Sequence, residues 1–368
     1  MATFSHKERR IFFNSKEGTA GTADTYAFFE GRSMQVTFPT VNYLKESNYA
    51  KLGSGEQGTL SQVQALYTPF SIKASRLSEV AFLMSYCLGK ADTVYSPTSG
   101  VQNHELEALA VTSRTLPTFT MHVGKQAATA CDVFNHCIIN DFSLTLAAGG
   151  NGVCDFTANG FANLHYLSSG SLTRNATTNQ SAFSGSATTA FAAEPLINYK
   201  ACNAWYGTAL ESTPLVQSLV TMSATDLGTP TSISAVLNSL TFTFSNSLSA
   251  DDLLRAGGNG ILNNQERKDH AITLELSMRK DVDYDAMALA NTQKAIEIQF
   301  SGPIIGATAY TYGMDIFFPI VQFGNIAQDT ESPINETLPC EVFEDSDHTA
   351  CAVYCQNAIA SGLNETLT

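Results

Sequence analysis

The sequence contains few charged residues, and this scarcity limits what the protein can be. Only 15% of its 368 residues are Asp, Glu, Lys or Arg, against roughly 25% in ordinary soluble proteins. Hydrophobic residues make up 44%, and Ser, Thr and Asn fill most of the polar positions. Strands with a neutral polar face suit contact with another protein better than contact with bulk water. The composition therefore predicts a component of a multi-subunit assembly.

Basic residues are scarcer than acidic ones. The chain has 20 Lys and Arg against 34 Asp and Glu, which gives a formal net charge of −14. Residues 329–368 contain 8 of the acids and no Lys or Arg, so the rest of the chain carries −14 + 8 = −6. This balance opposes attraction to a phosphate backbone. We expect no specific binding of nucleic acid.

Long apolar runs are missing as well. The nearest one, residues 80–88, is interrupted by Ser85 and is much shorter than the ~18 residues that cross a bilayer. The first ten residues carry basic side chains with no apolar core behind them, which does not fit a secretory signal. We therefore expect a protein made in the cytoplasm, with reduced cysteines and no membrane partner.

The sequence also lacks the motifs of common enzymes. It contains no GxSxG and no P-loop, and the pair His104-Glu105 is followed at position 108 by Ala. A zinc protease helix needs a second His at that position. We predict that the protein is not an enzyme and holds no cofactor.

A calcium loop is a weak alternative for one short segment. Asp281, Asp283 and Asp285 have the alternate spacing of such a loop, but Ala286 and Thr292 stand where Gly and Glu are required. The segment is better explained as the end of a strand followed by a helix with acids at its start.

What the sequence does contain is one strand pattern written twice. Residues 137–146 (CIINDFSLTL) lead into a glycine-rich segment at 149–152, and residues 235–244 (AVLNSLTFTF) lead, after a longer insertion, into another at 257–260. In both copies apolar and polar residues alternate, which predicts a half-buried strand, and the glycines predict a hairpin reversal rather than a phosphate cradle. The residues of these two signatures that we expect to serve assembly are Phe142, Leu144, Leu146, Gly149, Gly150, Leu240, Phe242, Phe244, Gly257 and Gly258.

Similar patterns divide the chain into parts. Residues 1–170 are a first half with an N-terminal arm, a helix at 78–88 that ends at Gly89, and a long loop at 94–116. Residues 171–190 are a Ser/Thr-rich bridge, and 191–328 are a second half with a short helix at 283–293. Further strands are expected at 34–38, 119–123, 156–164, 272–278, 296–300 and 310–318.

Residues 329–368 form an acidic tail that contains cysteine. Cys340, His348, Cys351 and Cys355 are four possible zinc ligands within it. Their spacing matches no standard zinc finger, so inert free thiols, or disulfides formed after cell lysis, are the alternatives.

Several segments together resemble a known family. They are residues 119–124 (FTMHVG), the first signature, 238–248 (NSLTFTFSNSL), 270–285 (HAITLELSMRKDVDYD), 294–302 (KAIEIQFSG) and 310–320 (YTYGMDIFFPI). In this order they resemble the tail tube, or major tail, proteins of long-tailed bacteriophages. The resemblance covers about residues 117–325 and leaves the first 60 residues and the acidic tail largely outside it.

The resemblance implies a mainly β fold, an antiparallel β-sandwich or barrel with a short flanking helix. It implies a virion protein that polymerises into stacked rings around a channel, through which the genome DNA passes during ejection without specific binding. Its partners would be its own copies and other tail proteins: the tape measure, the tail terminator and the distal tail protein. Two signatures in one chain raise the possibility of internal duplication, so that the ring would be a trimer of duplicated subunits; an ordinary hexamer is the alternative.

A second class of function competes with this one. A virion decoration protein, or a β-sandwich module that binds a receptor or glycan, would have a similar strand pattern. Such a module is expected to expose clustered aromatic side chains, whereas the chain has a single Trp, at position 205, and most other aromatics fall at core positions. These observations favour the tube.

Overall fold

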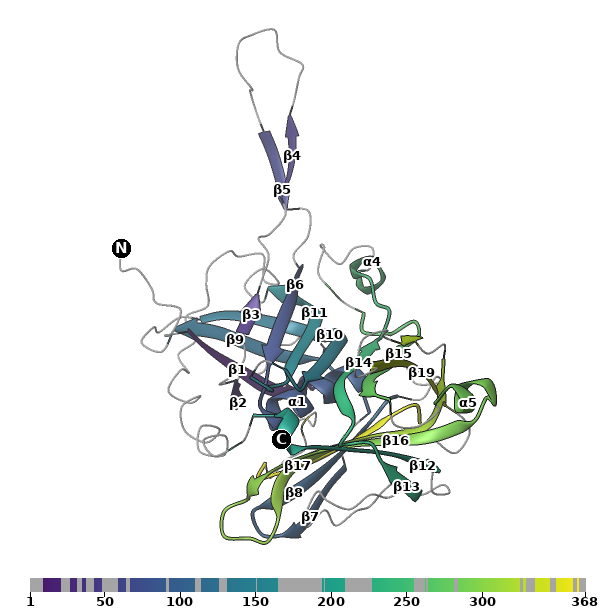
Figure 1. Cartoon of the computed structure of the whole chain (residues 1–368). Coiled ribbons are helices and arrows are strands. Elements are labelled where there is room, and N and C mark those ends of the chain that lie inside the picture. Colours follow the sequence, from purple (N-terminus) through teal and green to yellow (C-terminus); the bar gives the residue numbers. More distant parts are fainter. Residues whose placement is uncertain are drawn as a thin grey trace.

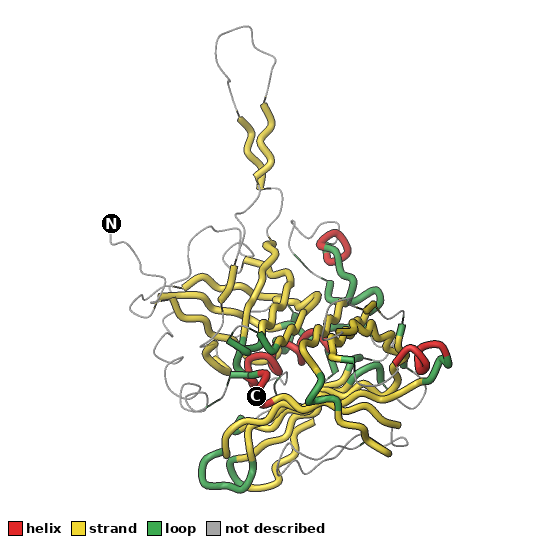
Figure 2. Tube along the Cα trace, viewed as in Figure 1, coloured by secondary structure: helices red, strands yellow, loops and turns green. Residues whose placement is uncertain are grey.

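The computed structural model describes most of the chain. The described residues are 9–20, 27–31, 35–37, 43–47, 59–63, 67–90, 93–109, 114–125, 131–149, 151–164, 194, 196–208, 227–254, 262, 264–280, 284–324, 327–328, 335–344, 349–359 and 363. The predicted bridge at 171–190 lies outside them. Strands dominate the described chain (Figures 1 and 2).

The described residues also contain three α-helices and one 3₁₀ helix. The helices are α1 (Leu77–Leu88), η3 (Tyr199–Ala201), α4 (Ala250–Leu253) and α5 (Tyr284–Leu289). The strands of the N-terminal half are β1 (Arg9–Lys16), β2 (Ala27–Gly31), β3 (Gln35–Thr37), β4 (Tyr43–Ser47), β5 (Thr59–Val63), β6 (Tyr67–Ala74), β7 (Thr93–Thr98), β8 (Val101–Glu107), β9 (Phe119–Lys125), β10 (Cys131–Ala147) and β11 (Asp155–Leu164). Those of the C-terminal half are β12 (Cys202–Thr208), β13 (Gly228–Ser232), β14 (Leu237–Ser245), β15 (Ala271–Arg279), β16 (Gln293–Ile304), β17 (Thr311–Phe323), β18 (Ala327–Gln328), β19 (Asn335–Phe343) and β20 (Ala352–Asn357).

The strands form two layers of antiparallel sheet. In the first layer the order is β3, β6, β11, β10, β14, β15, β19. In the second it is β13, β12, β16, β17, β20, β8, β7. The end of β19 also pairs with β17, and this pairing joins the layers into one open sheet. The arrangement is an antiparallel β-sandwich, as the sequence predicted.

Two groups of strands extend from this frame. The first half of β10 pairs with β9, which continues through β1 to β2. The strands β4 and β5 pair with each other as a separate hairpin, which projects away from the body of the protein (Figure 1).

Helix α1 lies between the two layers. All twelve of its residues are buried, and it contacts β10 and β14 of one layer and β8, β17 and β20 of the other. A helix covered on every side needs apolar residues all round, which LSEVAFLMSYCL largely provides. It ends as predicted at Gly89, whose φ of +91° is left-handed and whose N–H donates to the Ser85 carbonyl at 3.0 Å.

The two signature strands pair with each other. Phe142 of β10 lies opposite Phe244 of β14, Leu144 opposite Phe242, and Leu146 opposite Leu240. The ring of Phe142 is 5.1 Å from that of Phe242, and Phe242 reaches across to Phe318 of the other layer at 4.9 Å. The signatures thus form the centre of the core.

The prediction of a loop at 94–116 is wrong for most of that segment. Residues 93–98 and 101–107 form the hairpin β7–β8, with a turn at Ser99-Gly100, and β8 pairs with β20. The alternation of β8 is hidden because polar residues occupy buried positions. His104 is one of them, and its Nε2 lies 3.0 Å from Asn357 Oδ1.

The acidic tail supplies two strands of the sandwich. β19 extends the first layer beside β15, and β20 lies between β8 and β17 in the second. Sequence patterns predicted no strand there, although Glu336, Leu338 and Cys340 alternate on the buried face of β19.

The remaining predicted elements have the expected type. β3, β9, β11, β15, β16 and β17 fall at the predicted strands, and α5 falls within 283–293. Among the described residues, no helix is both long and apolar enough to cross a membrane.

Phe242→Ala should destabilise the monomer strongly. The side chain is fully buried between Phe142 and Phe318, so its removal leaves a cavity, and we expect the free energy of unfolding to fall by about 3–5 kcal/mol. Thr243→Ala, on the opposite face of the same strand, should cost less than about 1 kcal/mol. Urea denaturation measures both, and similar losses in the two variants would contradict the assignment of Phe242 to the core.

Candidate functional site

The apolar signature residues lie inside the protomer and are not available to neighbouring copies. Phe142, Leu144, Leu146, Leu240, Phe242 and Phe244 are all buried in one cluster. Gly149 is exposed in the turn between β10 and β11, which confirms the first predicted hairpin reversal. Gly150, Gly257 and Gly258 lie outside the described residues.

The backbones of the signature strands are also occupied. β10 lies between β11 and β14, and β14 lies between β10 and β15. Strand addition by another chain must therefore use other strands. Because β10 and β14 run antiparallel, they are not equivalent positions in two units that follow each other head to tail around a ring.

The proposed zinc ligands do not converge. Cys340 is opposite Phe323 of β17, whereas Cys355 is opposite Met314 of the same strand. These positions are nine residues apart, which corresponds to roughly 30 Å along a strand. His348 lies outside the described residues. Within the described part, no three His, Cys, Asp or Glu side chains gather as a metal site would require.

The outward face of the first layer is lined with hydroxyls and amides. One row across it consists of Lys73, Thr157, Ser143, Thr243 and Thr273. The next row contains Ser71, Asn159, Asp141 and Ser245. This polar face follows from the alternation predicted for the signatures, whose other face fills the core.

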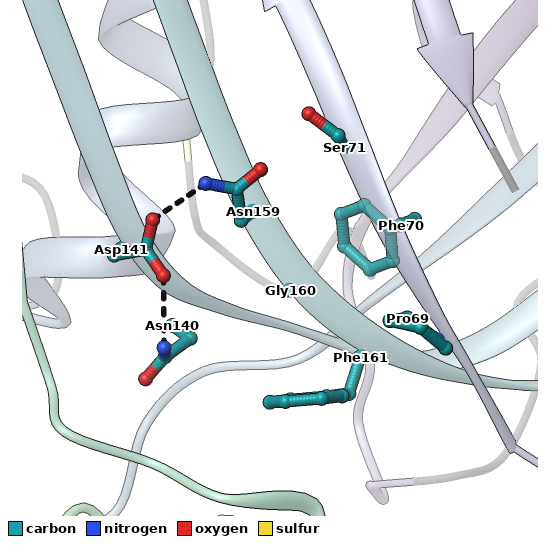
Figure 3. A pocket seen from close by; sticks show the side chains of 8 residues that line it. All are labelled: Pro69, Phe70, Ser71, Asn140, Asp141, Asn159, Gly160 and Phe161. Carbon is teal, nitrogen blue, oxygen red and sulfur yellow. Dashed lines mark hydrogen bonds between the residues drawn. The ribbon is translucent and has the colours of Figure 1, made fainter. Parts of the chain in front are cut away.

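A hollow interrupts this face where β6, β11 and β10 lie side by side (Figure 3). Its volume is about 290 Å³. Its lining consists of Pro69, Phe70, Ser71, Asn140, Asp141, Asn159, Gly160 and Phe161. On one side of it the Asp141 carboxylate accepts hydrogen bonds from Asn159 Nδ2 at 2.7 Å and from Asn140 Nδ2 at 2.8 Å (Figure 3).

A β-bulge creates the hollow. Ile139 is opposite Gly160 and Asp141 is opposite Asn159, so Asn140 is an extra residue in β10. Gly160 is required there because a Cβ would lie 2.1 Å from the Ile138 carbonyl oxygen. The sequence analysis missed this site, although the adjacent polar pair Asn140-Asp141 marks the position where the alternation of β10 shifts.

A second polar group of interest lies at the start of α1. The Glu194 carboxylate accepts a hydrogen bond from the Ser78 backbone N–H at 2.6 Å, and Arg76 Nη1 donates to the Glu194 carbonyl at 3.0 Å. Burial raises the pKa of Glu194 to about 7, and the neighbouring Glu79 adds to this effect. No local sequence signal predicts the contact, because 116 residues separate Glu194 from Ser78.

The raised pKa of Glu194 predicts a pH-dependent stability. Between pH 4.5 and 7 the folded protein keeps a proton on Glu194 that the unfolded chain releases, so the free energy of unfolding should fall by up to about 3 kcal/mol as the pH rises through this window. Glu194→Gln should flatten this dependence, whereas Glu275→Gln on the exposed face should not. Denaturation at several pH values measures the slopes, and an unchanged slope in Glu194→Gln would refute the assignment.

The buried cysteines predict slow reaction with thiol reagents. Burial raises the pKa of Cys154 and of Cys351 to about 12, and that of Cys87 well above its ordinary value. Because the thiolate is the reactive form, iodoacetamide at pH 8 should label these residues much more slowly in the native protein than in urea. Mass spectrometry of the labelled peptides provides the rates. Equal rates in both conditions would show that the thiols are accessible in the folded state.

Comparison with known proteins gives no family assignment for the chain. No family model matches it, and no curated protein does. The function of the chain must therefore be inferred from the geometry of its described residues.

Proposed function

We propose that this chain is a structural virion protein that assembles into the stacked rings of a bacteriophage tail tube. The observation that carries the proposal is the uneven protection of its sheet edges. A protein built to polymerise through strands needs edges that accept another strand, whereas a monomeric protein normally blocks them. In the described part of this chain, the edge strands that are longer than two residues and contain no proline all lie in the first 63 residues.

Seven strands have a single partner among the described pairings: β2, β3, β4, β5, β7, β13 and the two-residue β18. Pro97 lies within β7 and Pro230 within β13. Proline has no N–H to donate and discourages further pairing at an edge. β2 and β3 contain no proline, so they are better suited to receive a strand from a second copy.

A recurring order of elements supports internal duplication, with boundaries different from those of the sequence signatures. The pair β3 and β6 leads into α1 and the hairpin β7–β8, and the pair β14 and β15 leads into α5 and the hairpin β16–β17. In the first layer β14 lies four strands from β3, and β15 lies four strands from β6. Each pair of equivalents is parallel because four antiparallel steps separate its members. The two hairpins lie in opposite order about β20, so the correspondence concerns the first layer.

A head-to-tail ring requires that equivalent strands of successive units run parallel and recur at a regular spacing. The correspondence therefore favours the ring of three duplicated subunits over the ordinary hexamer. The next subunit would add at the end of the first layer that carries β3. The net charge of −14 would keep DNA from adhering as it passes through the channel.

The hairpin β4–β5 is suited to connecting successive rings. It projects from the body (Figure 1), and each of its strands pairs with the other. Two long segments expected from the sequence could also serve this role, the N-terminal arm and the loop at 94–116. Since the described part of the latter is mostly the hairpin β7–β8, paired with β20, the N-terminal hairpin is the better candidate. Other tail proteins would bind at the two ends of the tube.

Electron microscopy of the purified protein tests the proposal. We expect rings stacked into tubes, with class averages that show three-fold symmetry of the density and an approximate six-fold repeat. Protein that remains monomeric at every concentration, by microscopy and light scattering, would exclude the tube.

A deletion tests the role of the hairpin separately. Replacing residues 43–63 by a short Gly-Ser linker should leave rings but prevent their stacking, because the edges β2 and β3 remain. Thr231→Ala, an exposed change on the proline-bearing edge strand β13, should form normal tubes. Normal tubes from the deletion variant would show that β4–β5 does not connect the rings.

A further inference from the structure

The hollow at the bulge of β10 differs from the rest of the polar face in combining aromatic and ionic groups. Elsewhere the rows consist mainly of hydroxyls, whereas the lining here combines a carboxylate, two amides and a hydroxyl with an aromatic side chain (Figure 3). The assembly proposed above uses none of these residues. We infer that this hollow is a binding site for a single pyranose ring of a saccharide.

The polar wall of the hollow is held in place before any ligand arrives. Both oxygens of Asp141 accept amide hydrogen bonds, from Asn140 and from Asn159. Asn140 is held in turn, because its Oδ1 accepts the Leu248 backbone N–H at 2.7 Å. The three side chains therefore lose little conformational freedom on binding, which favours affinity for a small ligand.

This polar wall can both accept and donate hydrogen bonds. The carboxylate of Asp141 has lone pairs beyond the two that the amides occupy, and each amide group and the Ser71 hydroxyl can donate as well as accept. Sugar hydroxyls have the same double capacity, and a hydroxyl that donates to a carboxylate forms one of the stronger kinds of hydrogen bond. Neighbouring hydroxyls of one ring can be shared between Asp141 and Asn159.

The other wall is apolar. Phe161 lines the hollow and is half-buried, and its ring is supported by that of Tyr67, which lies outside the lining with its centre 6.4 Å away. Pro69 is exposed beside them on β6. The C–H face of a pyranose packs well against such a surface, because it buries apolar area on both sides.

The size of the hollow limits the ligand. Its volume of about 290 Å³ is at the lower end of the ~300–1,000 Å³ typical of small-molecule sites. It accommodates one ring and leaves the rest of a glycan chain on the polar face. A single ring held by a few hydrogen bonds and one stacking contact should bind with a Kd of about 1–10 mM.

Saturation-transfer NMR and calorimetry with the full chain test the site. The probes are glucose, galactose, mannose and N-acetylglucosamine, with the open-chain polyol mannitol as the matched control ligand. We expect at least one of the four sugars to bind and mannitol to bind at least tenfold more weakly, because it lacks the flat C–H face. Failure of all four sugars to bind at several times the expected Kd would overturn the inference, as would equal binding of mannitol.

Two conservative variants locate the binding. Asp141→Asn keeps the shape of the side chain and removes its charge, and Phe161→Leu keeps apolar bulk and removes the aromatic face. Each should weaken sugar binding at least tenfold, whereas Ser143→Ala, two residues away on the same face of β10, should leave it unchanged. Sugar binding that both variants retain would place the sugar elsewhere and refute the site.

Folding and assembly can be monitored independently of binding. Thermal unfolding identifies a variant that has lost its structure; if Asp141→Asn unfolds, Ser71→Ala takes its place as the polar-wall variant, with the same expected loss. The site does not depend on tube formation, so sugar binding can fail while tubes form, and tubes can fail while sugar binds.

Discussion

The pairing of β10 with β14 is the contact on which the rest of the structure depends. It joins strands separated by about a hundred residues and places Phe142, Phe242 and Phe244 on one face of the first layer. A shift of one residue in this register would turn all these side chains outward and bring Ser143 and Thr243 into the core. The large cost of that exchange fixes the register, and with it the positions of β11 and β15 on either side.

The buried helix sets a second constraint, which explains where some of the few ionisable groups lie. Because α1 is covered by both layers, the N–H groups of its first turn cannot reach water and need protein partners. Glu194 supplies one through Ser78, and Asn357 links Ser78 Oγ to His104. Glu194, one of the few ionisable residues of the chain, is therefore buried inside the sandwich. Its raised pKa makes the stability of the protein depend on pH.

The two proposals assign different parts of the molecule to different tasks. Strand edges free of proline occur in the N-terminal segment, where β2, β3 and the projecting hairpin are placed to meet other copies. The hollow occurs where the extra residue Asn140 disturbs the central strand β10. Both proposed roles follow from irregularities in an otherwise regular sheet. In one case these are edge strands with a single described partner, and in the other it is a β-bulge.

The sequence alone determined the fold class and eight of the twenty described strands, including the two at the centre of the core. Alternation in stretches such as 141–146 and 239–244 specifies which face of each strand is buried, whatever its neighbours are. It could not reveal β8, because buried Asn103, His104 and Glu107 break the pattern, and His104 has its partner Asn357 at a distance of 253 residues along the chain. It also presented β10 and β14 as repeats of one unit, whereas the tertiary structure made them partners. Contacts between residues distant in the chain decide which strands pair, which strands lie at an edge, the hydrogen bond from Ser78 to Glu194, and the hollow. Only the folded chain could therefore determine them.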